Sequence, residues 1–200
     1  EYFESGEYPT EVLEAGMDAG LVAQDIGEEY GGKGFSLEQV LAIAEEFYRA
    51  DAGIALTLQL ASFGAEILEE HGDDDLKEEF LRPVAENEQI TGLAVSEPET
   101  GSDLAGMATT AEKDGDEYVL NGEKYWIGNG VEADWVTVYA KTGDDENNRY
   151  GNYSLFVVPT DTEGYNAEHI PEKMAFRASK QAHLTLEDCR VPEEHLIGVE

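Results

Sequence analysis

Hydrophobic residues recur at helical spacing through the first ninety positions of the chain and predict several helices separated by Gly-rich turns. Pro9 suits the first turn of the earliest helix, which ends at Gly20. Ser36 and Gln39 have the spacing of a capping box, so another helix begins there, after a loop at residues 31–34. Its apolar residues form one face: Leu37, Val40, Leu41, Ala44, Phe47 and Tyr48.

Two further helices are predicted in the same half of the chain. Residues 54–68 are apolar on nearly all sides, which is typical of a helix buried inside a bundle, and the His-Gly pair at Gly72 ends it. Residues 74–86 carry apolar side chains on one side, with Pro83 close to the end. Together these helices indicate an α-helical bundle domain over residues 1–90.

The pattern then changes to β-branched and aromatic runs separated by short turns. Asp114-Gly115 and Asn121-Gly122 are dipeptides typical of two-residue β-hairpin turns. Residues 91–200 are therefore predicted to form a mostly antiparallel β-barrel or sandwich. The fold class is α+β with two domains, and no low-complexity linker separates them. The expected strands lie at residues 118–120, 125–127, 135–140, 153–158 and 183–186.

Acidic residues greatly outnumber basic ones: 45 Asp and Glu stand against 12 Lys and Arg, a formal net charge of −33. Residues 1–90 hold 23 acids and residues 91–200 hold 22, so the excess is spread along the chain. Repulsion among so many like charges weakens a fold in dilute salt, whereas the screening length falls to ~3 Å near molar salt. The composition therefore indicates a salt-adapted, halophile-like protein.

The same composition argues against other classes of protein. Binding of nucleic acid needs a basic face for the phosphates, which 12 scattered bases do not supply. A nucleic-acid mimic or a weak calcium binder stays the alternative explanation of the acidity, although residues 73–75 and 144–146 lack the spacing of a calcium loop. The 4 histidines show no short metal-ligand spacing, so no metal is expected.

Cys189 is the only cysteine, so no intrachain disulfide is expected. No apolar signal segment and no apolar run of membrane-spanning length stands out in the sequence. Hydrophobic residues make up 41% of the chain, which is enough to build a buried core. These features favour a folded, soluble, cytoplasmic enzyme.

Two loops carry the residues best suited to bind a ligand. Residues 93–103 read Leu-Ala-Val-Ser-Glu-Pro-Glu-Thr-Gly-Ser-Asp, and residues 121–130 read Asn-Gly-Glu-Lys-Tyr-Trp-Ile-Gly-Asn-Gly. Gly101 lets a ligand approach the backbone closely, and hydroxyls such as that of Ser102 suit a phosphate or the edge of a heteroaromatic ring. Trp126 offers a platform for a flat ring. Taken singly, ordinary turns and a core tryptophan are the alternative explanations.

Taken together, in this order and at this spacing, the two loops resemble the flavin-binding segments of the acyl-CoA dehydrogenase family. That family carries a Thr/Ser-Glu-Pro-x-x-Gly-Ser-Asp loop and, after a short hairpin, Asn-Gly-x-Lys-x-Trp-Ile-x-Asn. The resemblance extends over nearly the whole chain, from Tyr8-Pro9 to residues 195–198. It implies an N-terminal helical domain, a middle β-domain and FAD as cofactor, with the C-terminal helical domain of the family absent from these 200 residues.

The resemblance also assigns residues to the cofactor. It implies that residues 93–102 line the flavin ring and the pyrophosphate of FAD, and that residues 126–128 cover the other side of the ring. Ser102 is also implied to contact the acyl-CoA substrate. The cofactor-binding residues assigned in this way are Leu93, Ala94, Val95, Ser96, Gly101, Ser102, Trp126, Ile127 and Gly128.

Gly128 departs from the family pattern, because a hydroxyl residue that hydrogen-bonds the flavin usually stands at this position. Only a backbone N–H is available here, so one side-chain control on the reactivity of the flavin is missing. Glu99-Thr100 replaces the usual small pair and is a milder departure. Arg149 is a candidate for a contact to a CoA phosphate, with a solvated surface charge as the alternative.

The activity implied by the resemblance is the α,β-dehydrogenation of an acyl-CoA thioester to the 2,3-enoyl-CoA. The catalytic base of the family is a glutamate of the C-terminal domain, so it is expected beyond Glu200, and no catalytic residue is assigned within the chain. An electron-transfer flavoprotein is the implied electron acceptor, and a homotetramer is the implied assembly. An acyl-CoA oxidase that uses oxygen, and a non-catalytic flavin- or CoA-binding module, are the alternatives.

Overall fold

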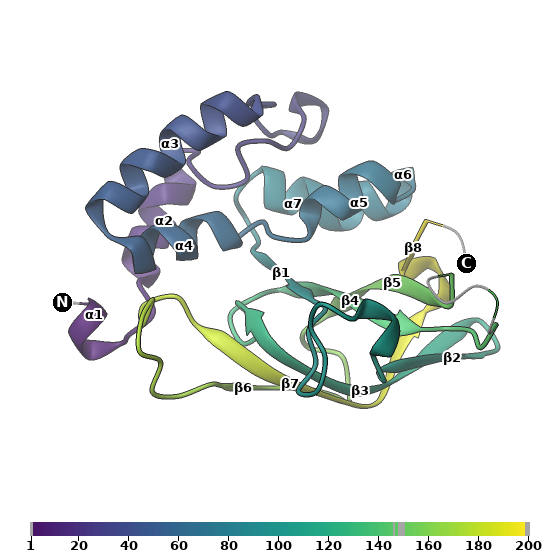
Figure 1. The fold of residues 1–200 in the computed structure, drawn as a ribbon. Coiled ribbons are helices and arrows are strands. Elements are labelled where there is room, and N and C mark those ends of the chain that lie inside the picture. Colours follow the sequence, from purple (N-terminus) through teal and green to yellow (C-terminus); the bar gives the residue numbers. More distant parts are fainter. Residues whose placement is uncertain (1, 146, 148–150, 199–200) are drawn as a thin grey trace.

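A layer of helices lies over one side of a curved β-sheet in the computed structural model, which describes residues 2–145, 147 and 151–198 (Figure 1). The prediction of a helical domain followed by a β-domain is confirmed. The helices are α1 Tyr2–Ser5, α2 Thr10–Asp18, η1 Glu28–Tyr30, α3 Leu37–Ala50, α4 Ala52–Leu60, α5 Ala65–His71, α6 Asp74–Leu76, η2 Lys77–Leu81, α7 Arg82–Ala85, η3 Leu104–Gly106 and η4 Glu193–His195. The strands are β1 Thr91–Ala94, β2 Thr110–Asp114, β3 Glu117–Gly128, β4 Trp135–Lys141, β5 Tyr153–Pro159, β6 Tyr165–His169, β7 Gln181–Pro192 and β8 Leu196–Ile197.

Local side-chain chemistry sets the start of α3 as predicted. The Ser36 side chain accepts from the backbone N–H of Gln39, and the Gln39 side chain accepts from the backbone N–H of Ser36. This capping box satisfies two amides at the start of the helix that have no partner within it. The apolar face of α3 is only partly covered, since Leu37 is 70% exposed and Leu41 57% exposed.

The prediction of one helix over residues 54–68 is wrong, because two shorter helices occupy this segment. α4 ends at Leu60, and α5 begins at Ala65 after Gly64, whose φ is +101°. In the gap, the N–H of Thr91 donates to the carbonyl of Ala61 at 2.8 Å, which anchors the start of β1 to the end of α4. The spacing of apolar residues carries no information about the backbone conformation of a glycine. The break between the two helices at Gly64 was therefore not predictable from the pattern.

The helix predicted at residues 74–86 is observed as a continuous run of α6, η2 and α7, with Pro83 inside it. The middle part, η2, is a π-helix that ends two residues before Pro83, and this proline has no N–H to give to the carbonyl of the preceding turn. Phe80 of η2 packs edge-on against Trp135 of β4 at 5.9 Å and against His195 at 5.1 Å. These ring contacts fasten the helical layer to the sheet.

Among the described residues, eight strands form one sheet in the order β6-β7-β3-β2-β4-β5-β8, with β1 pairing in parallel to β4. Most other pairs are antiparallel, and β2 touches β4 through a single parallel pair. The rings of Tyr118 on β3 and Phe156 on β5 lie 4.9 Å apart, although two strands separate β3 from β5 in the sheet order. The sheet therefore curves over its own apolar core, as expected for a barrel-like domain.

The predicted hairpin turn at Asn121-Gly122 is wrong, whereas the one at Asp114-Gly115 is confirmed between β2 and β3. Residues 117–128 form a single long strand, and the register between β3 and β7 shifts by one residue beside Gly122. The extra residue is on β7, where Asp188 has φ +50° and donates its N–H to the Asn121 side chain at 2.9 Å. Asn-Gly here serves a β-bulge, a feature that shares its residue preferences with tight turns.

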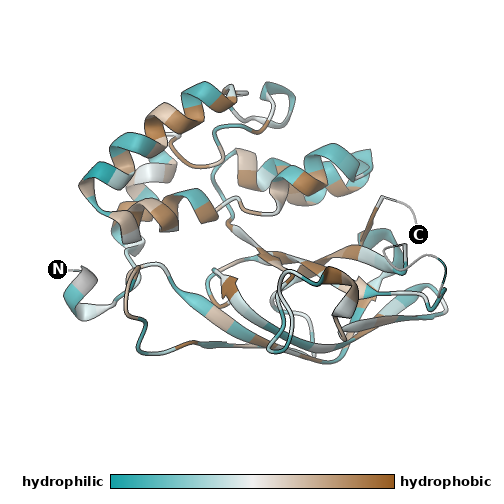
Figure 2. Ribbon diagram, in the orientation of Figure 1, coloured by the Kyte–Doolittle hydropathy of each residue, from teal (hydrophilic) through white to brown (hydrophobic). Residues whose placement is uncertain are grey.

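The helices and the sheet share one apolar core, and the sheet has a second one of its own. The shared core joins helical residues such as Leu68 and Leu81 to Trp135, Val157 and Ile197 of the sheet. Apolar positions alternate with polar ones along the strands and helices (Figure 2). Within residues 2–145, 147 and 151–198, no helix is long and apolar enough to cross a membrane.

Candidate functional site

The first ligand-binding loop leaves the sheet at the end of β1. Pairing of β1 with the central strand β4 fixes its backbone, with Leu93 opposite Thr137 and Ala94 opposite Val138. Leu93, Val95 and Ser96 are half-buried, and the Ala94 methyl lies wholly in the core of the sheet. Ala94 is 0% exposed as a whole residue, so its backbone is covered as well.

Farther along, the loop becomes exposed. Gly101 and Ser102 both face solvent, and a Cβ atom at Gly101 would meet no described atom within 4 Å. The protein's own packing therefore does not explain a glycine at this position, and an approaching ligand would. The buried Met107 and two hydrogen bonds from the Tyr153 hydroxyl, to the carbonyls of Ala105 and Met107, hold the end of the loop.

Trp126 occupies a bulge near the end of β3. Tyr125 pairs with His183 and Ile127 with Ala182, the next residue of β7, so Trp126 between them has no partner in the ladder. Its φ of +66° is unusual for a residue with a bulky side chain, and its side chain is 57% exposed. Backbone strain of this kind concentrates at functional sites. Ile127, by contrast, is only 2% exposed as a whole residue and packs in the core of the sheet.

Backbone contacts bring the two predicted segments together. The N–H of Tyr125 donates to the carbonyl of Ser96 at 2.8 Å, so the residue before Trp126 is tied to the first loop. A Cβ atom at Gly92 would lie 2.6 Å from the carbonyl oxygen of Gly128, so β1 and the end of β3 approach too closely for a side chain at residue 92. Residues 93–96 and 125–128 therefore line one region of the β-domain, with residues 101–102 farther along the loop.

Leu60 explains the glycine at residue 128. A Cβ atom at Gly128 would lie 2.9 Å from Cδ1 of Leu60, at the end of α4. The leucine side chain thus occupies the space next to this backbone that a side chain at residue 128 would enter. A side chain at residue 128 and the Leu60 side chain would therefore compete for the same space.

Gly128→Thr is expected to lower the free energy of unfolding by about 1–3 kcal/mol, because the new side chain overlaps Leu60. Leu60→Ala removes the overlapping atoms, so the double variant should be more stable than the sum of the single effects by at least about 1 kcal/mol. Urea unfolding of the four proteins in molar salt measures this coupling. Strictly additive effects would contradict the steric explanation.

Glu97 and Lys124 are functional candidates to which the sequence alone assigned no role. The Lys124 ammonium is fully buried and donates to the carboxylate of Glu97 at 2.9 Å and to the carbonyl of Val95 at 3.1 Å. The other contacts of Glu97 are the N–H groups of Ala108 at 2.7 Å and Thr109 at 2.9 Å. The signal in the sequence was a lysine between buried strand positions, which a solvated surface charge does not explain.

The pKa values of Glu97 and Lys124 are both lower than the ordinary values of these groups. Burial raises the pKa of Glu97, but the hydrogen bonds from Ala108, Thr109 and Lys124 together outweigh burial and hold it below its ordinary value. Burial lowers the pKa of Lys124, and Glu97 partly offsets the effect. Glu97 is therefore a carboxylate committed to three donors and is unsuited to take a proton from a substrate.

A second acid, Glu132, is also desolvated. Burial raises its pKa, while the nearby charges of His169 and Lys180 act in the opposite direction, and His169 Nε2 lies 3.2 Å from the carboxylate. It follows Asn129, whose side chain accepts from the Tyr8 hydroxyl and donates to the carbonyl of Leu60. Burial and the charge of Glu132 both raise the pKa of Tyr8, so Glu132 lies where the N-terminal segment meets the β-domain.

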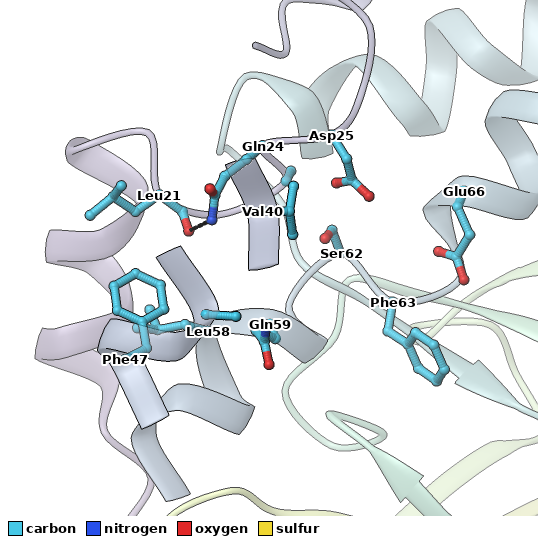
Figure 3. A pocket seen from close by; sticks show the side chains of 12 residues that line it. Leu21, Gln24, Asp25, Val40, Phe47, Leu58, Gln59, Ser62, Phe63 and Glu66 are labelled. Carbon is cyan, nitrogen blue, oxygen red and sulfur yellow. Dashed lines mark hydrogen bonds between the residues drawn. The ribbon is translucent and has the colours of Figure 1, made fainter. Parts of the chain in front are cut away.

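One hollow borders the first loop, and another lies in the helical layer. One of about 440 Å³ lies under the first loop and includes Thr100, whose hydroxyl is buried without a partner among the described residues. The other, of about 310 Å³, lies in the helical layer (Figure 3). There Gln24 donates to the carbonyl of Leu21, and its buried Oε1 has no described partner. The lining of this second hollow is Leu21, Ala23, Gln24, Asp25, Val40, Ala44, Phe47, Leu58, Gln59, Ser62, Phe63 and Glu66.

Gly64, the residue after Phe63 of this lining, contacts the start of the first loop. A Cβ atom at this glycine would lie 3.4 Å from Cβ of Leu93 and 3.1 Å from the carbonyl of Gly92. Phe63, which lines the hollow, is 44% exposed. The helical layer therefore borders the same region as the loops. Arg149, the candidate for a phosphate contact, lies outside the described residues.

Two family profiles match the chain in succession. Residues 1–88 match the profile described as acyl-CoA dehydrogenase, N-terminal domain, and residues 92–189 match the one described as acyl-CoA dehydrogenase, middle domain. The chain belongs to the acyl-CoA dehydrogenase family. The family inferred from the two loop motifs is therefore confirmed, and its members are FAD-dependent oxidoreductases.

Relatives agree in sequence and in structure. The chain is 36% identical over 195 residues to the probable acyl-CoA dehydrogenase FadE25 of Mycobacterium tuberculosis, covering 98% of the chain and 50% of the relative. The glutaryl-CoA dehydrogenase of Mycobacterium smegmatis, solved in complex with FADH2, superposes with a TM-score of 0.90 at 31% identity, over 100% of the chain and 50% of that protein. Butyryl-CoA dehydrogenase from Megasphaera elsdenii gives 0.91 at 30% identity, over 100% and 53%. The chain spans about half the length of the curated relatives it matches.

Proposed function

We propose that this chain forms the flavin- and substrate-binding part of an FAD-dependent acyl-CoA dehydrogenase, which converts an acyl-CoA thioester to the 2,3-enoyl-CoA. The proposal combines the family with the site described above. The residues proposed to contact FAD are Leu93, Ala94, Val95, Ser96, Gly101, Ser102, Trp126, Ile127 and Gly128, and Ser102 is also proposed to contact the acyl-CoA.

The observation that carries the proposal is the exposed, strained Trp126 beside the first loop. An indole that is 57% exposed leaves a large apolar surface in water unless a ligand covers it. The isoalloxazine ring of FAD is flat and apolar on its faces, and the next residues present little that would obstruct it, since Ile127 points into the core and residue 128 is glycine. The residues present therefore fit this cofactor.

The chain's own residues bind and orient the reactants in this proposal. When bound, FAD supplies the acceptor for the hydride that leaves the acyl chain. Trp126 holds the ring by stacking, and the exposed backbone at Gly101 and the hydroxyl of Ser102 donate hydrogen bonds to phosphate or substrate oxygens. The base that removes the proton is proposed to lie outside residues 1–200, as the family resemblance implies, and Glu97 is already committed to structural hydrogen bonds.

Three finer properties belong to the same proposal. An electron-transfer flavoprotein is the proposed electron acceptor, and a homotetramer the proposed assembly, both carried over from the family resemblance. Adaptation to high salt rests on the net charge of −33, which is spread over both halves of the chain. The chemistry of the acceptor is open to direct measurement, because release of hydrogen peroxide during turnover would favour an oxidase.

Reconstitution with FAD tests the function. The protein as its gene encodes it, prepared in molar salt and mixed with FAD, should show the visible absorbance band of a bound flavin. Addition of acyl-CoA substrates of different chain length should bleach this band as electrons move to the flavin. Absence of a bound flavin, or a band that no acyl-CoA bleaches, would contradict the proposal.

Gly101→Ala sharpens this test. A Cβ atom at Gly101 meets no described atom within 4 Å, so folding should change by less than about 0.5 kcal/mol. If the flavin pyrophosphate approaches this backbone, the dissociation constant for FAD should rise about tenfold. Flavin fluorescence titration measures the constant, and the exposed Gly115→Ala change in a hairpin turn is the control. Equal affinity for FAD in the Gly101 variant would remove this glycine from the site.

A further inference from the structure

Lys124 is a fully buried cation in a protein with few cations. Its side chain is 0% exposed, and it points from β3 toward the start of the first loop, where it donates to the carbonyl of Val95 and to the carboxylate of Glu97. Charged side chains are almost never buried in this way without a partner, and the partner here lies 27 residues earlier in the chain. The pair therefore joins the two ligand-binding segments directly.

Glu97 joins the beginning of the loop to its end. One carboxylate oxygen accepts from the N–H of Ala108 at 2.7 Å, and the other accepts from the N–H of Thr109 at 2.9 Å and from Lys124. The carbonyl of Thr109 in turn accepts from the N–H of Lys141 on β4. A single carboxylate thus closes the loop over residues 97–109 and connects it to the sheet.

The part of the loop that this carboxylate closes has little apolar anchorage of its own. Residues 98–99 and 101–104 are exposed, and they include Gly101 and Ser102. Such a segment opens locally at little cost unless polar contacts hold its ends. Tyr153, through its hydroxyl, holds the carbonyls of Ala105 and Met107, so the Glu97 carboxylate and this hydroxyl together restrain the far end of the loop.

The same lysine also adjoins the tryptophan side of the site. Lys124 directly precedes Tyr125, whose N–H donates to the carbonyl of Ser96, and Trp126 follows in its strained bulge. Three consecutive links therefore tie residues 95–97 to residues 124–125: the contacts of Lys124 with Val95 and with Glu97, and the contact of Tyr125 with Ser96. Any movement of the first loop relative to Trp126 has to break this set.

We propose that Lys124 and Glu97 are positioning residues for the flavin site, which hold the first loop at a fixed distance from Trp126 so that both can contact one cofactor. This inference rests on the proposed function for the identity of the cofactor, but the ordering of the loop does not depend on it. A preorganised loop binds a ligand more tightly because less conformational freedom is lost on binding.

The test compares Lys124→Met with Lys113→Met in the protein as its gene encodes it. Lys113 forms an ion pair with Glu193 at 2.7 Å, and it is matched in residue type but largely exposed and on β2. Lys124→Met should raise the dissociation constant for FAD at least about tenfold and change the visible circular dichroism of the bound flavin, whereas Lys113→Met should leave both unchanged. Amide hydrogen exchange of residues 96–109 should speed up in the first variant only.

The outcomes separate the pair's role from the cofactor's identity. Unchanged FAD affinity, dichroism and loop exchange in folded Lys124→Met would overturn the inference, even if the variant is less stable overall. If Lys124→Met does not fold, Glu97→Gln decides the question by the same measurements, since it keeps the shape of the side chain and removes its charge. If the unaltered protein binds no FAD, the proposed function fails, while hydrogen exchange still shows whether the pair orders the loop.

Discussion

The protein is expected to unfold when salt is removed and to regain a stable fold in molar potassium chloride. Even if all 12 bases paired with acids, 33 of the 45 acidic groups would stay unpaired. At about 0.01 M salt the screening length is ~30 Å, so carboxylates repel one another across the whole molecule, whereas at about 1 M it is ~3 Å. We expect a loss of at least about 5 kcal/mol, enough to unfold a domain of ordinary stability.

Urea unfolding at increasing salt concentration measures this effect. The midpoint should rise steeply up to molar salt and then level off as screening becomes complete. Sucrose is the control, because it stabilises proteins by exclusion from their surface and screens no charge. A protein that is equally stable in sucrose at low salt and in potassium chloride would not fit this explanation. A flat dependence on salt would show that the acidic excess has another role.

The sequence predicted elements best where local chemistry decides the structure. The capping box of Ser36 and Gln39 specifies the start of α3 with its own hydrogen bonds, and the Asp114-Gly115 turn joins β2 to β3 as expected. Runs of β-branched and aromatic residues located β4, β5 and the part of β7 at residues 183–186. In each case the residues that carry the signal lie within a few positions of the feature they determine.

Features that depend on contacts between distant segments were not predictable in this way. The bulge beside Gly122 depends on Asp188 of the neighbouring strand β7, which donates to the Asn121 side chain, and the break between α4 and α5 depends on β1 pairing with the end of α4. The local sequence of an Asn-Gly pair or of an apolar run does not show whether a distant segment of the chain packs against it. Tertiary contacts therefore overrode the local preference at both places.

The same division applies to the candidate site. The loop motifs pointed to Trp126 and Ser102, but the pattern did not reveal that Ala94 and Ile127 bury their side chains or that Leu60 fills the space beside Gly128. Residues proposed to contact a ligand can be recognised from a sequence motif. The residues that support them from other elements become visible only once the chain is folded.

Gly122→Ala is expected to destabilise the β-domain, with a loss of at least about 3 kcal/mol in the free energy of unfolding. Gly122 has φ +152°, and a Cβ atom there would lie 2.5 Å from the hydroxyl oxygen and 2.7 Å from Cα of Thr109. The backbone of Thr109 cannot move aside freely, because its N–H donates to Glu97 and its carbonyl accepts from Lys141. The backbone strain of an alanine at this φ and the overlap of its methyl group with Thr109 therefore both lower the free energy of unfolding.

Gly115→Ala is the matched control, because that glycine also has a positive φ, of +71°, but a Cβ atom there would meet no described atom within 4 Å. It should cost only the strain of about 1–2 kcal/mol. Urea unfolding in molar salt compares the two, and equal losses would show that Thr109 yields to the new methyl group. A larger loss at Gly122 should come with weaker FAD binding, because displacement of Thr109 would pull one of its donors away from Glu97 and loosen the loop that faces Trp126.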